Sequence, residues 1–306
     1  MIKIAAVILN WNRENDTLAC LASIAKVIEN NFDLEVVVVD NGSDNKSINA
    51  IKNYISKDKK LTIKLIENKQ NYGYAKGNNI GIKYALKRGC DYILILNNDT
   101  IVEANFLTYL LNSFKDKHVG VVAPKIYFAK GFEFHKDRYI NSDKGKVIWS
   151  VGGDIDWQNV YATNKSVDIV DHGQFNKEQK VDFAPGTCIL VKASVFKELG
   201  FFDEQYYLYL EDTDFAVRAK RRGHEIVVNP KAIIWHKVAA SSAIGGALND
   251  YFITRNRILF GMRYANLRAR IALGRQALGL LIKGRPWQKR GVVDAFSGNY
   301  AKGSWK

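Results

Sequence analysis

Apolar runs and helix-like segments alternate along the first 125 residues, and this alternation limits the fold more than any other feature of the sequence. Apolar runs rich in Val, Ile and Leu predict buried strands over residues 4–9, 34–39, 61–66, 92–96 and 119–123. Helical patterns separate them around residues 14–29, 47–56, 77–88 and 103–116. This strand–helix–strand rhythm predicts an α/β fold with a Rossmann-like, mostly parallel sheet.

Polar residues close several of these predicted strands. Asn10 and Asn12 follow the first, Asp40 opens the segment DNGSDN after the second, and Asp99 ends the segment LNND after the fourth. Each loop alone could be a turn, since Asn, Asp and Gly favour turns. Ligands of parallel sheets bind outside the carboxyl ends of the strands. Polar loops after four successive strands therefore favour a binding site at this edge.

The pattern changes after the fifth predicted strand. Residues 127–183 contain Gly, Lys, Asp and scattered aromatic residues, which predicts short strands and long loops. Regular structure then resumes with strands predicted over 188–191, 225–228 and 232–235 and helices over 193–199 and 212–222. We expect this part to add a mixed extension to the sheet and to be followed by helices after residue 250.

The basic charge of the chain is concentrated at its end. The net charge is +14, and residues 251–306 carry twelve Lys and Arg but one acid, Asp294, so that only +3 remains for residues 1–250. Nucleic-acid binding is not expected, because acids at the strand ends would repel a phosphate backbone. The tail carries an apolar stripe flanked by arginines: Leu267, Ile271, Leu278 and Ile282, with Arg268 and Arg275.

Two interpretations of this stripe remain open. It suits a helix lying on anionic lipid, with residues 255–290 making a peripheral membrane contact. Alternatively, the C-terminal helices pack on the catalytic domain or on a second subunit of a homo-oligomer, with the arginines in solvent. The three cysteines are far apart and indicate neither a disulfide framework nor a zinc site. The sequence contains no run of about 18 apolar residues, so no membrane-spanning helix is predicted. The first residues fit a strand better than a signal peptide. We expect a cytoplasmic protein, with membrane contact at the inner face.

Six segments, taken in order, resemble the family 2 glycosyltransferases of the GT-A fold, particularly the bacterial rhamnosyltransferase-like branch: ILNWN, VVVDNGSDN, NYGYAKGNNIGI, LILNNDTIV, APGTCILVKASVFKELGFFDEQYYLYLEDTDFAVRAKRRGH and IIWHK. The resemblance implies metal-dependent, inverting transfer of a sugar from a nucleotide-sugar donor, dTDP-rhamnose or a UDP-hexose. The implied acceptor is a hydroxyl of a glycan or lipid-linked glycan of the cell surface, such as O-antigen or capsule. It also implies a catalytic domain over residues 1–245, with a nucleotide-binding half to 125 and an acceptor half over 126–245, and a basic helical extension over 246–306.

The resemblance assigns a divalent cation, Mn²⁺ or Mg²⁺, to Asp99 and His236. The metal motif of the family usually has Asp at both ends, whereas Asn97 and Asn98 precede Asp99 here, so contact between Asn97 and the metal is an open question. Two structural alternatives exist. Asp99 could cap a helix starting near Glu103, and a lone His after a strand is often structural.

The resemblance also places the general base at Asp212, with Glu211 supporting it or binding the acceptor. Inverting transfer needs one carboxylate to take the proton of the attacking hydroxyl. The alternative is that these acids and Asp214 only stabilise a helix N-terminus. Arg218 could contact a diphosphate or pair with Glu211 or Asp214.

Donor binding is assigned to strand ends and to one glycine-containing turn. Asp40 matches the position that binds the nucleobase, and a helix N-terminus after the turn could approach phosphate or sugar. The predicted donor-binding residues are Asn10, Asn12, Asp40, Gly73, Lys76, Gly77, Asn78, Asn97, Asn98 and Gly186. The alternative functions are a noncatalytic sugar-nucleotide-binding protein and a nucleotidyltransferase.

Overall fold

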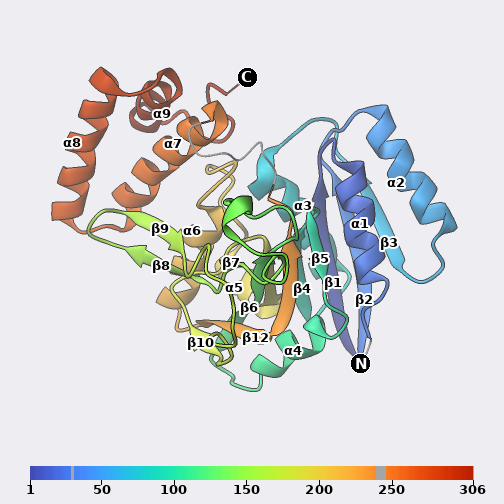
Figure 1. Ribbon diagram of the computed structural model, residues 1–306. Helices are drawn as coiled ribbons and strands as arrows, with labels where there is room; N and C mark the ends of the chain where they lie inside the picture. Colours follow the sequence, from blue (N-terminus) through green and yellow to red (C-terminus); the bar gives the residue numbers. More distant parts are fainter. Residues whose placement is uncertain (29–30, 239–245, 306) are drawn as a thin grey trace.

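The computed structural model describes residues 1–28, 31–238 and 246–305, and a central sheet runs through it with helices on both sides (Figure 1). The first part contains β1 (Ile2–Asn10), α1 (Glu14–Ile24), β2 (Phe32–Asp40), α2 (Asn45–Lys57), β3 (Thr62–Glu67), α3 (Gly73–Lys87), β4 (Tyr92–Asn97), β5 (Thr100–Val102), α4 (Phe106–Ser113) and β6 (Val119–Phe128). The second part contains a short 3-10 helix (Lys136–Arg138), β7 (Ile148–Ser150), β8 (Gly153–Asp156), β9 (Tyr161–Asn164), β10 (Gln179–Lys180), β11 (Cys188–Lys192), α5 (Ala193–Leu199), α6 (Glu211–Arg221), β12 (Glu225–His236), α7 (Ala247–Tyr264), α8 (Leu267–Lys283) and α9 (Pro286–Ser297).

Within the described residues, ten strands form one mixed sheet, whose main path runs β10-β12-β6-β11-β4-β1-β2-β3. Strands β3, β2, β1 and β4 are parallel neighbours, whereas β11 is antiparallel to both β4 and β6. Strand β12 is parallel to β6 and antiparallel to β5 and β10, and β7 pairs antiparallel with β6. The predicted fold class, a mostly parallel sheet with a mixed extension, is confirmed.

The strand register brings the polar strand ends to one edge. Asn10 at the end of β1 pairs with Asp40 at the end of β2, and Leu9 pairs with Asn97 of β4. The backbone N–H of Asn97 also donates to the carbonyl of Thr187 at 2.9 Å, which brings the loop before β11 to the same edge. The carboxyl ends of three parallel strands and this loop therefore lie together.

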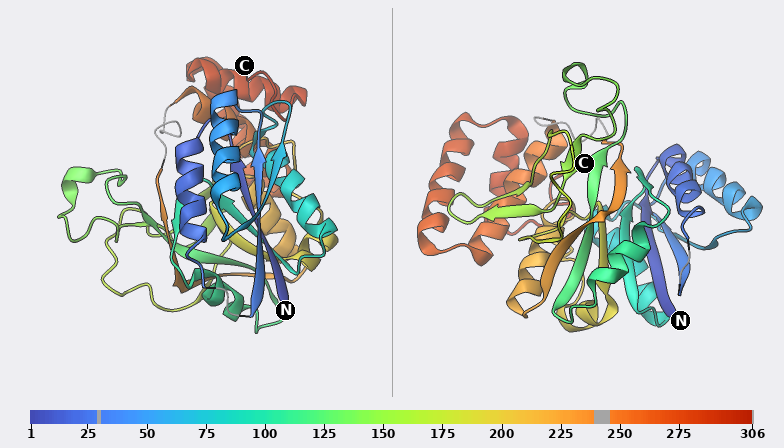
Figure 2. Two further views of the ribbon diagram at one scale, coloured as in Figure 1. Left: turned by 90° about the vertical axis from the view of Figure 1, so that its right-hand side faces the viewer. Right: turned by 60° about the horizontal axis from the view of Figure 1, so that its bottom comes forward.

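An apolar core on each face of the sheet holds the helices. Successive strand residues point to opposite faces, so Val7 and Ile8 of β1 enter different cores. On the sheet face that carries Ile8, helices α1, α2 and α4 pack and bury Phe106. On the sheet face that carries Val7, helices α3, α5, α6 and α7 pack and bury Phe215. Part of the connection between β6 and β11, drawn in green, projects from the body of the molecule in both views of Figure 2.

The two strands predicted over residues 225–228 and 232–235 are one strand, β12. Its pairing with β6 shifts register between Asn229 and Ile233. Pro230 lies in this interval, and proline has no N–H to donate to a strand ladder. The irregularity therefore has a local cause, and the strand continues past it to His236.

The helix predicted to begin near Glu103 begins at Phe106, because residues 100–102 form β5 instead. The helix predicted over 77–88 begins earlier, at Gly73. The predicted division of the catalytic domain at residue 125 falls inside β6, so both halves share one sheet.

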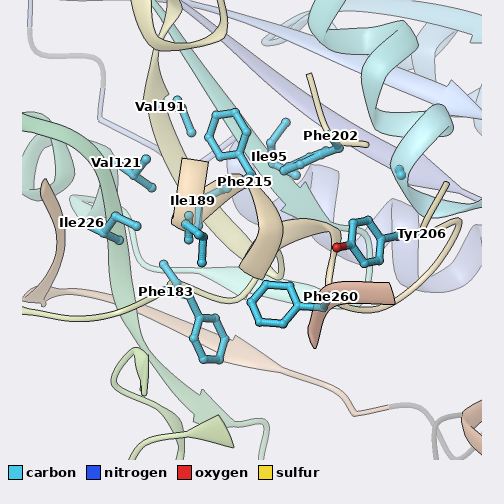
Figure 3. Packing of buried hydrophobic residues seen from close by; sticks show 14 of the residues in the cluster. Ile95, Val121, Phe183, Ile189, Val191, Phe202, Tyr206, Phe215, Ile226 and Phe260 are labelled. Atoms are coloured by element: carbon cyan, nitrogen blue, oxygen red, sulfur yellow. The ribbon is translucent and has the colours of Figure 1, made fainter. Parts of the chain in front are cut away.

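The C-terminal helices pack against the rest of the protein. Ile258 and Phe260 of α7 and Leu273 of α8 belong to the core that also contains sheet residues, and Figure 3 shows Phe260 near Tyr206 and Phe183. Residues 247–297 therefore share a hydrophobic core with the sheet.

The apolar stripe predicted on the tail lies on the outside of α8. The packing of the C-terminal helices on the catalytic domain agrees with the second interpretation. The stripe itself takes no part in this packing, because Leu267, Ile271, Leu278 and Ile282 are 73%, 50%, 62% and 75% exposed. No helix in the described part of the chain combines the length and apolarity that crossing a bilayer requires.

Candidate active site

A buried hydrogen-bond network joins the ends of β1, β2 and β4. Asn10 donates from Nδ2 to Asp40 Oδ1 at 2.7 Å and to Ser43 Oγ at 3.1 Å. Thr17 Oγ1 donates to Asn10 Oδ1 at 2.8 Å and accepts from Asn98 Nδ2 at 2.9 Å. The structure thus brings together three of the predicted donor-site residues, Asn10, Asp40 and Asn98.

Asp40 lies inside this network with no exposed surface. Its Oδ1 accepts from Asn10, and its Oδ2 accepts from the N–H of Ser43 at 2.9 Å. Asp40 therefore supports the loop that follows β2, and direct contact with a nucleobase would require this loop to open. Asn12, by contrast, is exposed, and its Oδ1 accepts from the N–H of Asp44 at 2.8 Å.

Two predicted glycines at the start of α3 allow close packing. Gly73 has a φ of +81°, and a Cβ added there would lie 2.4 Å from the ring of Tyr207. A Cβ on Gly77 would lie 2.5 Å from Leu9 Cδ1. Both glycines are buried, so the structure gives them roles in packing α3 against β1 and against the loop before α6.

The two other predicted residues of α3 differ in exposure. Asn78 is buried and donates to the carbonyl of Tyr74 at 3.0 Å. The side chain of Lys76 is 46% exposed, with Nζ 3.9 Å from Glu204 Oε2. Of the four predicted residues on α3, Lys76 is therefore the one that presents its side chain to solvent.

The pairing of β5 with β12 brings Asp99 and His236 together. His236 lies opposite Thr100 in this pairing, and the N–H of Lys237 donates to the carbonyl of Asp99 at 2.8 Å. Asp99 Oδ1 lies 3.1 Å from His236 Nε2, and the two side chains are 18% and 8% exposed. The alternative that Asp99 caps α4 is wrong, because the N-cap residue is Asn105.

The chemistry of this pair fits a divalent cation. Asp99 Oδ1 and His236 Nδ1 are buried and make no hydrogen bond with the described residues. The approach of Asp99 Oδ1 to His236 Nε2 at 3.1 Å is not a hydrogen bond. A buried carboxylate oxygen without a hydrogen bond is costly, and a cation would satisfy it. The ring of Trp149 packs edge-on against the imidazole at 4.6 Å between centroids and restricts its plane. No group of three or more His, Cys, Asp or Glu side chains in the described ranges is arranged to hold a metal ion, so water or phosphate oxygens would complete the coordination.

Tyr74 connects the end of β4 to the predicted base. Its hydroxyl lies 2.6 Å from the carbonyl oxygen of Gly186 and 3.0 Å from Asn97 Oδ1, within hydrogen-bond distance of both. The N–H of Gly186 donates to Asp212 Oδ2 at 2.7 Å. The amide oxygen of Asn97 is thus occupied by Tyr74, and Gly186 holds the carboxylate of Asp212.

Burial raises the pKa of both acids at the start of α6. Glu211 is 4% exposed, and burial and then the charge of Asp212 raise its pKa well above the ordinary value. Burial also raises the pKa of Asp212, although hydrogen bonds from the N–H groups of Gly186 and Thr213 act in the opposite direction. Asp212 is only partly buried, so it combines solvent access with the raised pKa that suits a general base.

The third acid of α6, Asp214, has a structural role. It is 1% exposed, accepts from Arg218 Nε at 2.8 Å, and accepts from the hydroxyl of Tyr264 at 2.6 Å. Arg218 therefore pairs with Asp214 within α6, as one of the alternatives predicted, and the hydrogen bond from Tyr264 to Asp214 links α6 to α7.

Sequence reasoning did not single out Tyr74 or Thr17. Burial and then the negative charges of Glu211, Asp212 and Asp99 raise the pKa of Tyr74 well above its ordinary value. A tyrosine inside an amphipathic helix gives no local signal of such a position. Its place beside the predicted turn at Gly73 was the only hint.

Comparisons with known proteins identify the family. Residues 5–200 match the family model described as glycosyl transferase family 2. The chain is 25% identical over 224 residues to a low-salt glycan biosynthesis hexosyltransferase of Haloferax volcanii, covering 73% of this chain and 63% of that protein. It is 26% identical over 267 residues to the dTDP-rhamnosyl transferase RfbF of Shigella flexneri, covering 84% and 79%.

A solved structure shares the fold. A mannosyltransferase of Pyrobaculum calidifontis, in complex with GDP-Man and Mn²⁺, superposes with a TM-score of 0.56 at 15% identity, over 96% of this chain and 74% of that chain. The family model covers Asp40 and Asp99 but ends before Glu211 and His236, so the roles of the last two rest on the geometry above. Because the model matches most of the chain, this protein is a glycosyltransferase that belongs to glycosyl transferase family 2.

Proposed function

We propose that this protein transfers a sugar, with inversion, from a nucleoside-diphosphate sugar to a hydroxyl of a growing cell-surface glycan. One observation supports this most directly: the loop that holds Asp212 through the N–H of Gly186 also accepts from the N–H of Asn97, two residues before Asp99, so Asp212 and the Asp99–His236 pair lie at the same sheet edge. The proposed donors are dTDP-rhamnose and a UDP-hexose, because two relatives are named as a dTDP-rhamnosyl transferase and a hexosyltransferase. Residues 1–125 would bind the nucleotide and residues 126–245 the acceptor.

Asp212 is the general base in this proposal. The N–H groups of Gly186 and Thr213 hold its two carboxylate oxygens at 2.7 Å each, which fixes its orientation. It takes the proton of the acceptor hydroxyl while the hydroxyl oxygen bonds to the anomeric carbon, and the bond from that carbon to the diphosphate oxygen breaks with its electron pair. Glu211, which is buried next to Asp212, supports the base. Its raised pKa favours the neutral carboxyl, and this limits the negative charge beside Asp212.

Asp99 Oδ1 and His236 Nε2 are the atoms that would hold Mn²⁺ or Mg²⁺. When bound, a divalent cation offsets the charge of a diphosphate leaving group. An imidazole ligand suits Mn²⁺ better than Mg²⁺, which prefers oxygen. Lys76, exposed on the first turn of α3, is placed to approach a phosphate or the donor sugar.

A panel of nucleotides and nucleotide sugars, screened for thermal stabilisation with and without Mn²⁺ or Mg²⁺, tests this proposal, because a bound ligand stabilises the native state. Wild type and Asp212→Asn should show metal-dependent stabilisation, and Asp99→Asn should lose it. Turnover of Asp212→Asn should fall by ~10²- to 10⁴-fold. The exposed acid Asp137 offers a control variant, Asp137→Asn, with the same change of charge.

Four outcomes would contradict the proposal. Near-normal turnover of Asp212→Asn would reject the base, and metal-independent binding in every variant would reject the cation. Metal-dependent binding without sugar transfer by the wild type would indicate a noncatalytic sugar-nucleotide-binding protein. Release of pyrophosphate from a nucleoside triphosphate would indicate a nucleotidyltransferase.

The outer face of α8 is proposed to lie on anionic lipid at the inner face of the cell membrane. Leu278 and Ile282 are exposed there, α8 has no acid, and Arg275 is exposed nearby. Each basic residue near an anionic surface contributes about 1 kcal/mol, and a membrane position would bring the enzyme to a lipid-linked acceptor.

Flotation with vesicles of phosphatidylglycerol and phosphatidylcholine tests the lipid contact in the full chain. The variant Leu278→Asp/Ile282→Asp should lose binding, whereas Asn53→Asp/Ser56→Asp on α2, at the opposite end of the molecule in Figure 1, carries the same charge change and should keep it. Equal binding of both variants would remove the membrane role. If the wild type binds no vesicles and sediments as a dimer, and Leu278→Asp/Ile282→Asp sediments as a monomer, the face contacts a second subunit instead.

A further inference from the structure

The segment that precedes the predicted catalytic acids has an unusual backbone. Tyr207, Tyr209 and Leu210 have φ values of 63°, 71° and 70°, in the left-handed region that residues other than Gly rarely adopt. Residues in such conformations persist where the surrounding structure holds them. Leu210 is the N-cap residue of α6, so its backbone angles set the direction of the helical turn that carries Glu211 and Asp212.

Asn256 of α7 contacts this segment through its side-chain amide. It has no exposed surface. Its Nδ2 donates to the carbonyl oxygens of Tyr206, Leu208 and Tyr209 at 2.9, 2.7 and 2.8 Å. The two amide hydrogens are therefore shared among three carbonyls of one short segment. Because all three acceptors are backbone atoms, these contacts depend on the conformation of the segment and not on its side chains.

Arg255, also fully buried, orients Asn256 and adds contacts of its own. Its Nε donates to Asn256 Oδ1 at 2.9 Å, which turns the amide so that Nδ2 faces the segment. Its Nη2 donates to the carbonyls of Gln205 and Tyr206 at 3.1 and 2.8 Å. The guanidinium thus acts on the same stretch of backbone as the amide does.

Helix α3 holds the segment from the other side. The N–H groups of Tyr74 and Ala75 donate to the carbonyl of Tyr207 at 2.7 and 3.2 Å. The ring of Tyr207 stacks on Phe252 of α7, with centroids 5.1 Å apart and planes inclined by 12°. Residues 205–209 are therefore clamped between the start of α3, on the donor side, and α7 of the C-terminal extension.

We propose that Asn256 and Arg255 are positioning residues for sugar transfer. By fixing the carbonyls of residues 205, 206, 208 and 209, they hold Leu210 in its left-handed conformation and so aim Asp212 at the acceptor. This inference rests on the proposed role of Asp212 as the base. The family model ends at residue 200, before both the segment and α7, so the match assigns no role to either residue.

Two substitutions of Asn256 and one control test the inference in the full chain. Asn256→Ala removes the donor, and Asn256→Asp keeps the size but turns an acceptor towards the three carbonyls. Leu259→Ala removes a buried apolar side chain from the same helix, in the shared core. Both Asn256 variants should lose ~10²-fold in kcat, the scale of a misplaced catalytic group, with KM for the donor unchanged. The control should lower the thermal midpoint and leave kcat unchanged.

Hydrogen exchange measured by mass spectrometry gives a readout independent of activity. Peptides that cover residues 203–212 should exchange faster in the Asn256 variants than in wild type and in Leu259→Ala. Should Asn256→Ala not fold, Arg255→Lys makes the same test, because it keeps the charge and removes the Nε–H that orients Asn256.

The proposal is overturned if exchange in residues 203–212 is unchanged, or if kcat falls no further than in Leu259→Ala. If the wild type transfers no sugar from any donor, the proposed function fails on that result alone. The exchange measurement then still decides whether Asn256 holds the segment.

Discussion

Replacing Glu211 by Gln should stabilise the protein at neutral pH while lowering its activity. The Glu211 carboxyl is 4% exposed, and its Oε2 makes no hydrogen bond with the described residues. Burial and the neighbouring Asp212 raise its pKa well above the ordinary value of 4.5. The ionised form is therefore disfavoured in the folded protein, and Gln has nearly the same shape without the charge.

The size of the effect follows from the cost of ionising the buried carboxyl, which a Gln amide does not bear. We therefore expect the free energy of unfolding of Glu211→Gln to gain on that of the wild type by about 1.4 kcal/mol for each pH unit above about 4.5, until the folded-state pKa is reached.

The pH dependence has a definite sign. The folded state binds the proton of Glu211 more tightly than the unfolded chain does, so this group contributes stability that is complete below about pH 4.5 and is lost as the pH rises through the folded-state pKa. Glu211→Gln has no such group. Its advantage should be absent below that pH and should grow as the pH rises.

Urea unfolding followed by tryptophan fluorescence at a series of pH values measures this difference, because the free energy of unfolding falls linearly with denaturant. Asp137→Asn, at an exposed position of the 3-10 helix, controls for the removal of one negative charge and should show no comparable gain. The reasoning is refuted if Glu211→Gln is no more stable than wild type at neutral pH. A gain that does not change with pH would also refute it.

Three further predictions follow from the site. Turnover should fall as the pH drops through the folded-state pKa of Asp212, at a pH above the ordinary 3.8, because the base must be ionised and burial raises its pKa; a rate–pH profile that stays flat into the ordinary Asp range would contradict this. Gly77→Ala should lower the free energy of unfolding by about 1–3 kcal/mol, because its Cβ would lie 2.5 Å from Leu9 Cδ1; unchanged stability with weaker nucleotide binding would favour the predicted phosphate role instead. Tyr74→Phe should lower kcat more than it changes KM for the donor, because it removes the hydroxyl that contacts Gly186; an unchanged kcat would show that Asp212 is held without it.

The sequence alone determined the elements of the first half and the edge at which the site lies. Strands of a parallel sheet are buried on both faces, so they appear as continuous apolar runs, and the polar residues that follow them must come at their carboxyl ends. This is why Asn10, Asn98 and Asp99 could be assigned to one edge before their contacts were known. The resemblance to a known family added the choice of Asp212 among three neighbouring acids.

Tertiary structure alone decided which of these residues meet and which are covered. Asp99 and His236 are neighbours only because β5 pairs with β12. The continuity of β12 was hard to predict, because Pro230 has no N–H to donate to a strand ladder. Asp40 and Gly77 lie at the predicted edge but are buried by packing with distant segments.

The role of α7 could not be predicted from a basic tail at all. Asn256 and Arg255 act on backbone carbonyls of residues 205–209. Every residue carries the same carbonyl group, so no pattern of side chains marks the segment that a buried amide or guanidinium will reach. Only the folded arrangement of α3, α6 and α7 specifies that contact.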